Sequence, residues 1–251
     1  MTQNIYDDAA FFTAYARLER SIEGLEGAIE WPALHTLLPD LKEHRVLDLG
    51  CGYGWFCRWA RTEGASSVQG IDVSERMLER AASMTNDTAI TYTRADLEQV
   101  ELPPASFDLA YTSLAFHYLT KLDRLLAQIY RSLVPGGHLI FSVEHPIYTA
   151  PSHPGWSLSP TGQQVWPVDR YLEEGPRTTD WLAPGVIKQH RTLTTYVNLL
   201  LQTGFHLRHL EEWGPSDAQI AASPLLAQER DRPPFLLISA VRPEEATHVA
   251  E

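Results

Sequence analysis

Three glycines at alternate positions follow an apolar run in the stretch VLDLGCGYG, residues 46–54. An acid, Asp48, interrupts the run, and Trp55 follows the last glycine. Glycine tolerates left-handed backbone and lets a ligand approach the chain closely. The stretch therefore predicts a strand that ends in a tight turn. The turn either binds a ligand or only redirects the chain into a helix.

Strand-like and helical patterns alternate on both sides of this turn. Ser74 is placed to cap a helix that carries Met77 and Leu78 on one side. Strands are expected at 45–50, 67–73, 89–95, 107–114, 138–143, 206–213 and 233–243. Helices are expected at 55–62, 74–82, 122–133 and 191–204. The alternation predicts a doubly wound, Rossmann-like α/β fold, with a mostly parallel sheet between two layers of helices.

Two segments depart from this alternation. Residues 146–190 are rich in proline and aromatic residues and are longer than an ordinary connection. Trp156, Trp166 and Trp181 favour an ordered lid over a disordered excursion, and a small satellite core is the other role open to them. Residues 1–44 look helical, because apolar side chains recur there at near-helical spacing: Phe11, Phe12, Tyr15 and Leu18.

The composition of the chain disfavours several classes of partner and compartment. The net charge of −12 disfavours nucleic acid, whose binding needs Lys and Arg on its phosphates. Two cysteines, Cys51 and Cys57, fit no metal knuckle, so no metal site is expected. The first residues carry acids where a secretory signal carries positive charge. No apolar run approaches the ~20 residues that span a bilayer. We expect a cytoplasmic protein with no membrane partner.

The glycine turn can be tested against three kinds of ligand. A triphosphate loop needs Lys-Ser/Thr after its last glycine, and here Trp55 and Phe56 follow Gly54. A dinucleotide loop needs a third glycine at the place of Trp55. The remaining pattern, Asp-x-Gly-x-Gly-x-Gly from Asp48, favours a ligand without a pyrophosphate at the turn.

This pattern resembles the class I (seven-stranded) S-adenosylmethionine-dependent methyltransferases, most closely the small-molecule branch related to ubiquinone-biosynthesis methyltransferases. The resemblance is strong over residues 45–143, through VLDLGCGYG, GIDVSERML and LVPGGHLIFSV, and weaker over the final strands. It implies a seven-stranded sheet whose last strand is antiparallel. It also implies a single domain in five parts: a helical cover (1–44), a cofactor core (45–145), a substrate lid after the fifth strand (146–190), a C-terminal helix and strands (191–243) and a tail (244–251).

The resemblance also implies a cofactor, S-adenosyl-L-methionine, with S-adenosyl-L-homocysteine as the product. Asp72 lies 22 residues after Gly50, near the offset at which an acid binds ribose hydroxyls in dinucleotide folds, although capping of the next helix is its alternative role. For Met77 and Tyr15 the alternative role is packing in the core. The expected cofactor-binding residues are Tyr15, Arg20, Asp48, Gly50, Cys51, Gly52, Gly54, Asp72, Val73, Met77, Asp96, Leu97 and Ser113.

Methyl transfer from a sulfonium needs alignment and a dry site, and a hydroxyl acceptor also needs a base. His117, His145 and His190 are the candidate bases, although a lone histidine is usually structural. A carboxylate acceptor needs no base, and Arg191 is then placed to bind its charge. The motif typical of enzymes that methylate base or glutamine amines, Asn/Asp-Pro-Pro-Tyr, is absent from the sequence.

These features predict an enzyme that methylates a small molecule, with an oxygen acceptor favoured over nitrogen. The aromatic lid favours an apolar or aromatic acceptor. Two other functions are compatible with the pattern, a nicotinamide-dependent oxidoreductase and a protein that binds adenosylmethionine without catalysis. A homodimer is also compatible with the sequence, which leaves the acceptor open.

Overall fold

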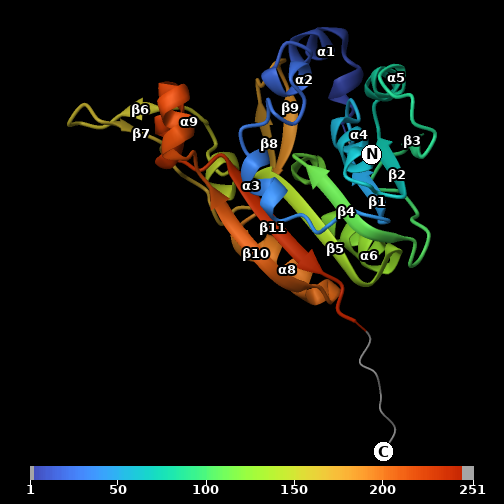
Figure 1. Ribbon diagram of the computed structural model, residues 1–251. Coiled ribbons are helices and arrows are strands. Elements are labelled where there is room, and N and C mark those ends of the chain that lie inside the picture. The colour runs from blue at the N-terminus through green and yellow to red at the C-terminus, as the bar shows by residue number, and fades with distance from the viewer. Residues whose placement is uncertain (1–2, 245–251) are drawn as a thin grey trace, which may run out of the picture.

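The computed structural model describes residues 3–244, and its centre is a seven-stranded sheet (Figure 1). The strands are β1 (Arg45–Leu49), β2 (Ser67–Asp72), β3 (Ile90–Arg94), β4 (Phe107–Ser113), β5 (Leu133–Glu144), β10 (His206–Trp213) and β11 (Phe235–Val241). Their order across the sheet is β10-β11-β5-β4-β1-β2-β3. Strands β1 to β5 pair in parallel, whereas β11 is antiparallel to both of its neighbours, β5 and β10. The predicted Rossmann-like sheet with an antiparallel last strand is confirmed.

Helices cover both faces of the sheet and enclose two cores. They are α4 (Trp55–Thr62), α5 (Glu75–Ser83), α6 (Leu122–Ser132) and α8 (Leu193–Thr203). Leucines of α6 pack with Tyr196 and Leu200 of α8 against one face, and Phe56 and Cys57 of α4 pack on the other. Leu133, expected to end α6, instead begins β5.

Caps at the helix ends agree with the sequence. The side chain of Ser74 accepts the backbone N–H of Met77 at 3.1 Å, which begins α5 as predicted. Helix α8 begins after Thr192, whose side chain accepts from Thr195, and ends at Gly204 with a left-handed φ of 104°. These local signals fix where each crossover helix meets the sheet edge.

The N-terminal segment, expected to be helical, forms a series of short helices. They are η1 (Ile5–Asp7), α1 (Ala9–Tyr15), α2 (Glu19–Ile22) and α3 (Trp31–Thr36). The apolar stripe expected through Leu18 is interrupted, because α1 ends at Tyr15 and Leu18 caps α2. Phe11 is fully buried, so the stripe still faces the protein.

The aromatic insertion is ordered. It comprises α7 (Pro146–Thr149) and two hairpins, β6 (Ser157–Leu158) with β7 (Gln164–Val165) and β8 (Gly175–Thr179) with β9 (Val186–His190). In Figure 1 the first hairpin projects beside α9 (Asp217–Ala222), away from the body, and the second stands beside α1 and α2. The second hairpin contacts the N-terminal segment, since Gln3 hydrogen-bonds Gly185 and Ile187.

The tryptophans of the insertion divide between the two expected roles. Trp181 packs edge-on against the rings of Phe11 and Tyr15, over the sheet edge. Trp156 and Trp166 form a satellite cluster. Of the expected tail, 244–251, residues 245–251 lie outside the described part of the chain. Across residues 3–244, none of the helices combines the length and apolar character needed to cross a bilayer.

Candidate functional site

A cavity of about 330 Å³ opens at the carboxyl edge of β1, β2 and β4, where open α/β sheets bind their ligands. It collects most of the predicted site residues: Tyr15, Arg20, Gly50, Gly52, Asp72, Val73, Met77, Asp96, Leu97, Ser113 and His117. A smaller adjoining cavity of about 100 Å³ adds Asp48 and Cys51. Gly54 lines neither cavity.

The three glycines of the turn differ in what they leave room for. All three have positive φ. A Cβ on Gly52 meets no protein atom within 4 Å, so this face of the turn is open. A Cβ on Gly50 comes to 2.6 Å from the Cβ of Ala115, and one on Gly54 overlaps the Tyr92 hydroxyl. Gly52 therefore leaves open space beside the cavity, whereas packing alone requires glycine at Gly54.

Asp72 ends β2 and holds the turn. Its carboxylate accepts the backbone N–H of Gly52 and that of Ser74, each at 2.9 Å. Burial raises the pKa of this carboxyl. Asp72 thus both supports the start of α5 and lines the cavity, so its two predicted roles are compatible.

Asp48 lies behind the turn, 2% exposed, and accepts a hydrogen bond from the thiol of Cys57 at 3.2 Å. Burial, and secondarily the charge of Asp72, raises the pKa of Asp48 to about 7. Within residues 3–244 neither carboxylate has an ion-pair partner, and no cluster of potential metal ligands is found. Two buried acids without an internal cation suit a ligand that carries positive charge.

His117 is the one candidate base that lines the large cavity. Its Nδ1 accepts the backbone N–H of Glu144 at 3.4 Å, which leaves the proton of the neutral ring on Nε2. Burial, with Lys188 and Arg191 nearby, lowers the pKa of His117 well below its usual value. A neutral Nε2–H donates a hydrogen bond. His117 is therefore suited to orient the molecule that accepts the methyl group rather than to remove a proton from it.

His145 and His190 line neither cavity, because remote partners engage both rings. The ring of His145 bonds Glu212 at 2.8 Å and accepts the N–H of Ile147 at 3.0 Å. That of His190 bonds Thr149 and the carbonyl of Tyr171, each at 2.8 Å.

Arg191 lines neither cavity either and donates to backbone carbonyls of Leu119 and Thr120. In this structure His145, His190 and Arg191 therefore face other protein groups rather than either cavity, and their roles towards an acceptor stay predictions.

Sequence reasoning missed the far end of the cavity. Glu144, the last residue of β5, forms a buried ion pair with Lys188 of β9, and its Oε2 is buried without a hydrogen-bond partner among the described residues. The other lining residues at this end are Tyr118, Tyr148, Trp181, Leu226, Glu229, Arg232, Pro234 and Phe235. The acid in SVEHP, directly after a predicted strand, was the one available signal.

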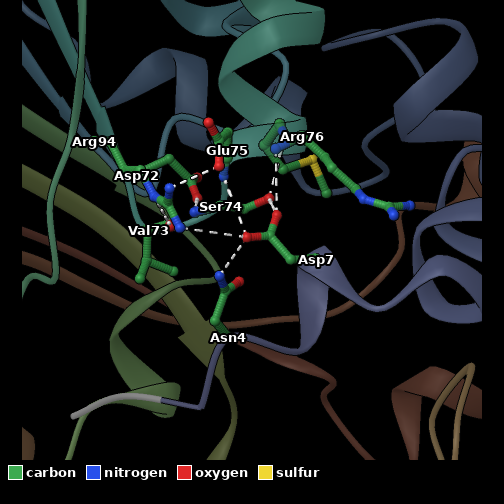
Figure 2. Close-up of polar contacts among 9 residues, drawn as sticks. Asn4, Asp7, Asp72, Val73, Ser74, Glu75, Arg76 and Arg94 are labelled. Atoms are coloured by element: carbon green, nitrogen blue, oxygen red, sulfur yellow. Dashed lines mark hydrogen bonds and ion pairs between the residues drawn. The ribbon is translucent and has the colours of Figure 1, made fainter.

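The N-terminal segment is fastened over the cavity by Asp7. Figure 2 shows its carboxylate facing the first turn of α5. It accepts from the hydroxyl of Ser74 at 2.6 Å, the N–H of Arg76 at 3.2 Å and the amide of Asn4 at 2.6 Å. Partial burial opposes ionisation, but these hydrogen bonds outweigh it and lower the pKa of Asp7.

Replacing Asp7 with alanine is expected to release this segment and weaken ligand binding at the cavity about fivefold, because a typical hydrogen bond contributes ~1 kcal/mol. Limited proteolysis and ligand titration measure both effects. Since the pKa of Asp7 is lowered, its stabilisation is complete above pH ~4 and fades as the pH falls below. Asp8→Asn is the matched control, because Asp8 caps only its own helix. Equal proteolysis of both variants would contradict the fastening role.

Comparison with known proteins identifies relatives. The profile of a family described as "Methyltransferase domain" matches residues 47–141. The crystal structure of an S-adenosylmethionine-dependent methyltransferase from Mesorhizobium loti has 57% identity and a TM-score of 0.85, covering 87% of this chain and 100% of that one. A Haemophilus influenzae protein is 35% identical over 96% of this chain and 98% of its own.

A third relative, the malonyl-[acyl-carrier protein] O-methyltransferase of Erwinia billingiae, is 39% identical over 98 residues. This match covers 39% of the chain and 38% of the relative. The family profile ends at residue 141, whereas the far end of the cavity is built largely from residues 144–235. The profile match therefore covers only the half of the cavity around the glycine turn.

Proposed function

Because the chain belongs to the S-adenosylmethionine-dependent methyltransferases, we propose that it methylates an oxygen of a small molecule bound in the large cavity beyond Ser113. The nicotinamide-dependent alternative loses its support, since the family is now established. The observation that carries the proposal is that Glu144 lines the same cavity as Asp72 and that its buried Oε2 has no hydrogen-bond partner among residues 3–244.

The residues at the turn fit the cofactor. Within residues 3–244 no ion pair neutralises Asp48 or Asp72, and a Cβ on Gly52 would meet no protein atom within 4 Å. A cationic ligand would favour the ionised form of both carboxyls, whose pKa burial raises. Asp72 would hold the ribose, Asp96 and Leu97 the adenine, and Arg20 with Tyr15 the methionine end. When bound, S-adenosylmethionine supplies a methyl group already activated on a sulfonium.

The far wall supplies what an oxygen acceptor needs. Glu144 has one oxygen paired with Lys188 and one free to accept the proton of a hydroxyl as it attacks. His117, neutral with its proton on Nε2, would orient the acceptor by donation. Trp181 and Tyr148 provide flat apolar walls that exclude water, which favours a small aromatic or apolar molecule.

Methyl transfer from labelled S-adenosylmethionine to a panel of acceptors tests the proposal. The panel contains phenols, phenolic acids, their amides, primary amines and malonyl-[acyl-carrier protein], the acceptor named for the shorter-matching relative. Label in phenolic oxygens supports the proposal. Transfer only to amines, only to the carrier protein, or to none of the panel refutes it.

Glu144→Gln is expected to lower kcat by about 10²–10⁴-fold, the usual contribution of a general base, with S-adenosylhomocysteine affinity nearly unchanged. Single-turnover transfer to a phenol measures the step directly. Glu173→Gln is the matched control, because Glu173 pairs with Arg170 at the surface and lines neither cavity. A wild-type rate in the Glu144 variant would remove the base assignment.

A further inference from the structure

Arg232 occupies an aromatic enclosure at the far end of the cavity. It lies between η3 (Pro224–Arg230) and β11 and is only 7% exposed. Its guanidinium carbon is 4.3 Å from the ring centre of Trp166, 4.4 Å from that of Tyr148 and 5.1 Å from that of Trp156. We call these four residues the Arg232 cage. Rings stabilise a guanidinium through its faces, and its N–H groups at the edge still need acceptors.

The hydrogen bonding of the cage is incomplete. One terminal nitrogen of Arg232 pairs with Glu229, but Nε is buried without a partner among residues 3–244. Buried donors are almost always satisfied in folded proteins, so an orphaned one points to a missing acceptor. Arg232, Glu229 and Tyr148 all line the large cavity. The missing acceptor can therefore belong to a molecule bound there.

The strand order sets how far this donor lies from the cofactor end. The sequence of strands from Asp72 is β2, β1, β4, β5 and β11. Arg232 precedes Phe235, the first residue of β11, which pairs with Glu144 of β5. Two inter-strand spacings separate β11 from β4, or roughly 10 Å at 4.8 Å each. A group at Arg232 is therefore remote from the end of β4, after which His117 follows, and β5 with Glu144 lies between the two.

We propose that Arg232 anchors a carboxylate of the acceptor, at the opposite end of that molecule from the oxygen that receives the methyl group. This inference rests on the proposed function and narrows its acceptor to a hydroxy acid with a flat apolar body. The carboxylate accepts from the buried edge of the guanidinium, in competition with Glu229. Tyr148 and Trp181 flank the body between the two ends.

Calorimetric titration in the presence of S-adenosylhomocysteine tests the anchor without requiring turnover. The probes are 4-hydroxybenzoate, 4-hydroxyphenylacetate and 3-(4-hydroxyphenyl)propionate, each beside its amide. At least one acid is expected to bind the wild type tenfold or more tightly than its amide. Arg232→Gln should abolish that preference. Glu229→Gln should increase the affinity for the acid, because it removes the competing carboxylate.

Arg170→Gln is the matched control, because it removes the same charge from a surface pair with Glu173, also three residues apart. Thermal unfolding shows whether each variant is folded, and the Glu229 variant tests the anchor even if Arg232→Gln unfolds. The anchor is overturned if no acid binds better than its amide, if the preference survives Arg232→Gln, or if Glu229→Gln weakens the acid and the amide alike. Methyl transfer to phenols without acid preference overturns the anchor alone, whereas binding without any transfer overturns the proposed function.

Discussion

Replacing Asp72 with alanine is expected to weaken binding of S-adenosylhomocysteine by about 1–3 kcal/mol, or roughly 5–150-fold. The carboxylate lines the cavity and also accepts the N–H groups of Gly52 and Ser74. Its removal leaves those donors and the ribose hydroxyls without an acceptor. Because Asp72 also shapes the turn, the expected loss of affinity has two sources, a missing contact to the ligand and a less ordered loop.

Isothermal titration of the folded variant measures this effect. Asp87→Ala is the control, since Asp87 pairs with Arg61 near the surface, away from both cavities. It should bind the product as the wild type does. If the Asp72 variant is folded and binds with unchanged affinity, Asp72 is not the ribose ligand.

Gly52→Val is expected to reduce S-adenosylhomocysteine binding at least a hundredfold while the protein remains folded. The added side chain meets no protein atom within 4 Å of its Cβ, and Gly52 lines the same cavity as Asp72. The left-handed φ of 51° costs about 1–2 kcal/mol in any L residue, which lowers Tm by a few degrees.

Gly54→Ala provides the contrast, because its φ is also positive but its Cβ overlaps Tyr92. It should lose more stability than Gly52→Val and, where folded, retain more affinity. Thermal unfolding measures the loss of stability in each variant, and calorimetric titration measures its affinity for S-adenosylhomocysteine. Tight binding by Gly52→Val would mean that the cofactor does not bind against this face of the turn.

The sheet and the grouping of residues around the glycine turn could be predicted from the sequence because their signals are local. The strand before Gly50, the cap at Ser74 and the offset of Asp72 all lie within some thirty residues, and one βαβ unit brings them together. Gly54 is the exception, since it lines neither cavity and its left-handed φ and the packed ring of Tyr92 account for the glycine.

The acceptor half could not be predicted in the same way, because distant segments build it. The antiparallel β11 inserts between β5 and β10, which carries Arg232 to the edge beside Glu144. Lys188 reaches Glu144 from a hairpin that no periodicity predicts. The surroundings of His145 and His190 could not be predicted for the same reason, since Glu212 and Tyr171 bond their rings from remote positions in the chain.

The most direct test of the account is a crystal structure of the protein with S-adenosylhomocysteine. We expect ribose hydroxyls within hydrogen-bond distance of Asp72 and the sulfur directed along the cavity towards Glu144 and His117. A nucleoside bound elsewhere, or a sulfur directed away from Glu144, would contradict the arrangement of donor and acceptor ends in one cavity.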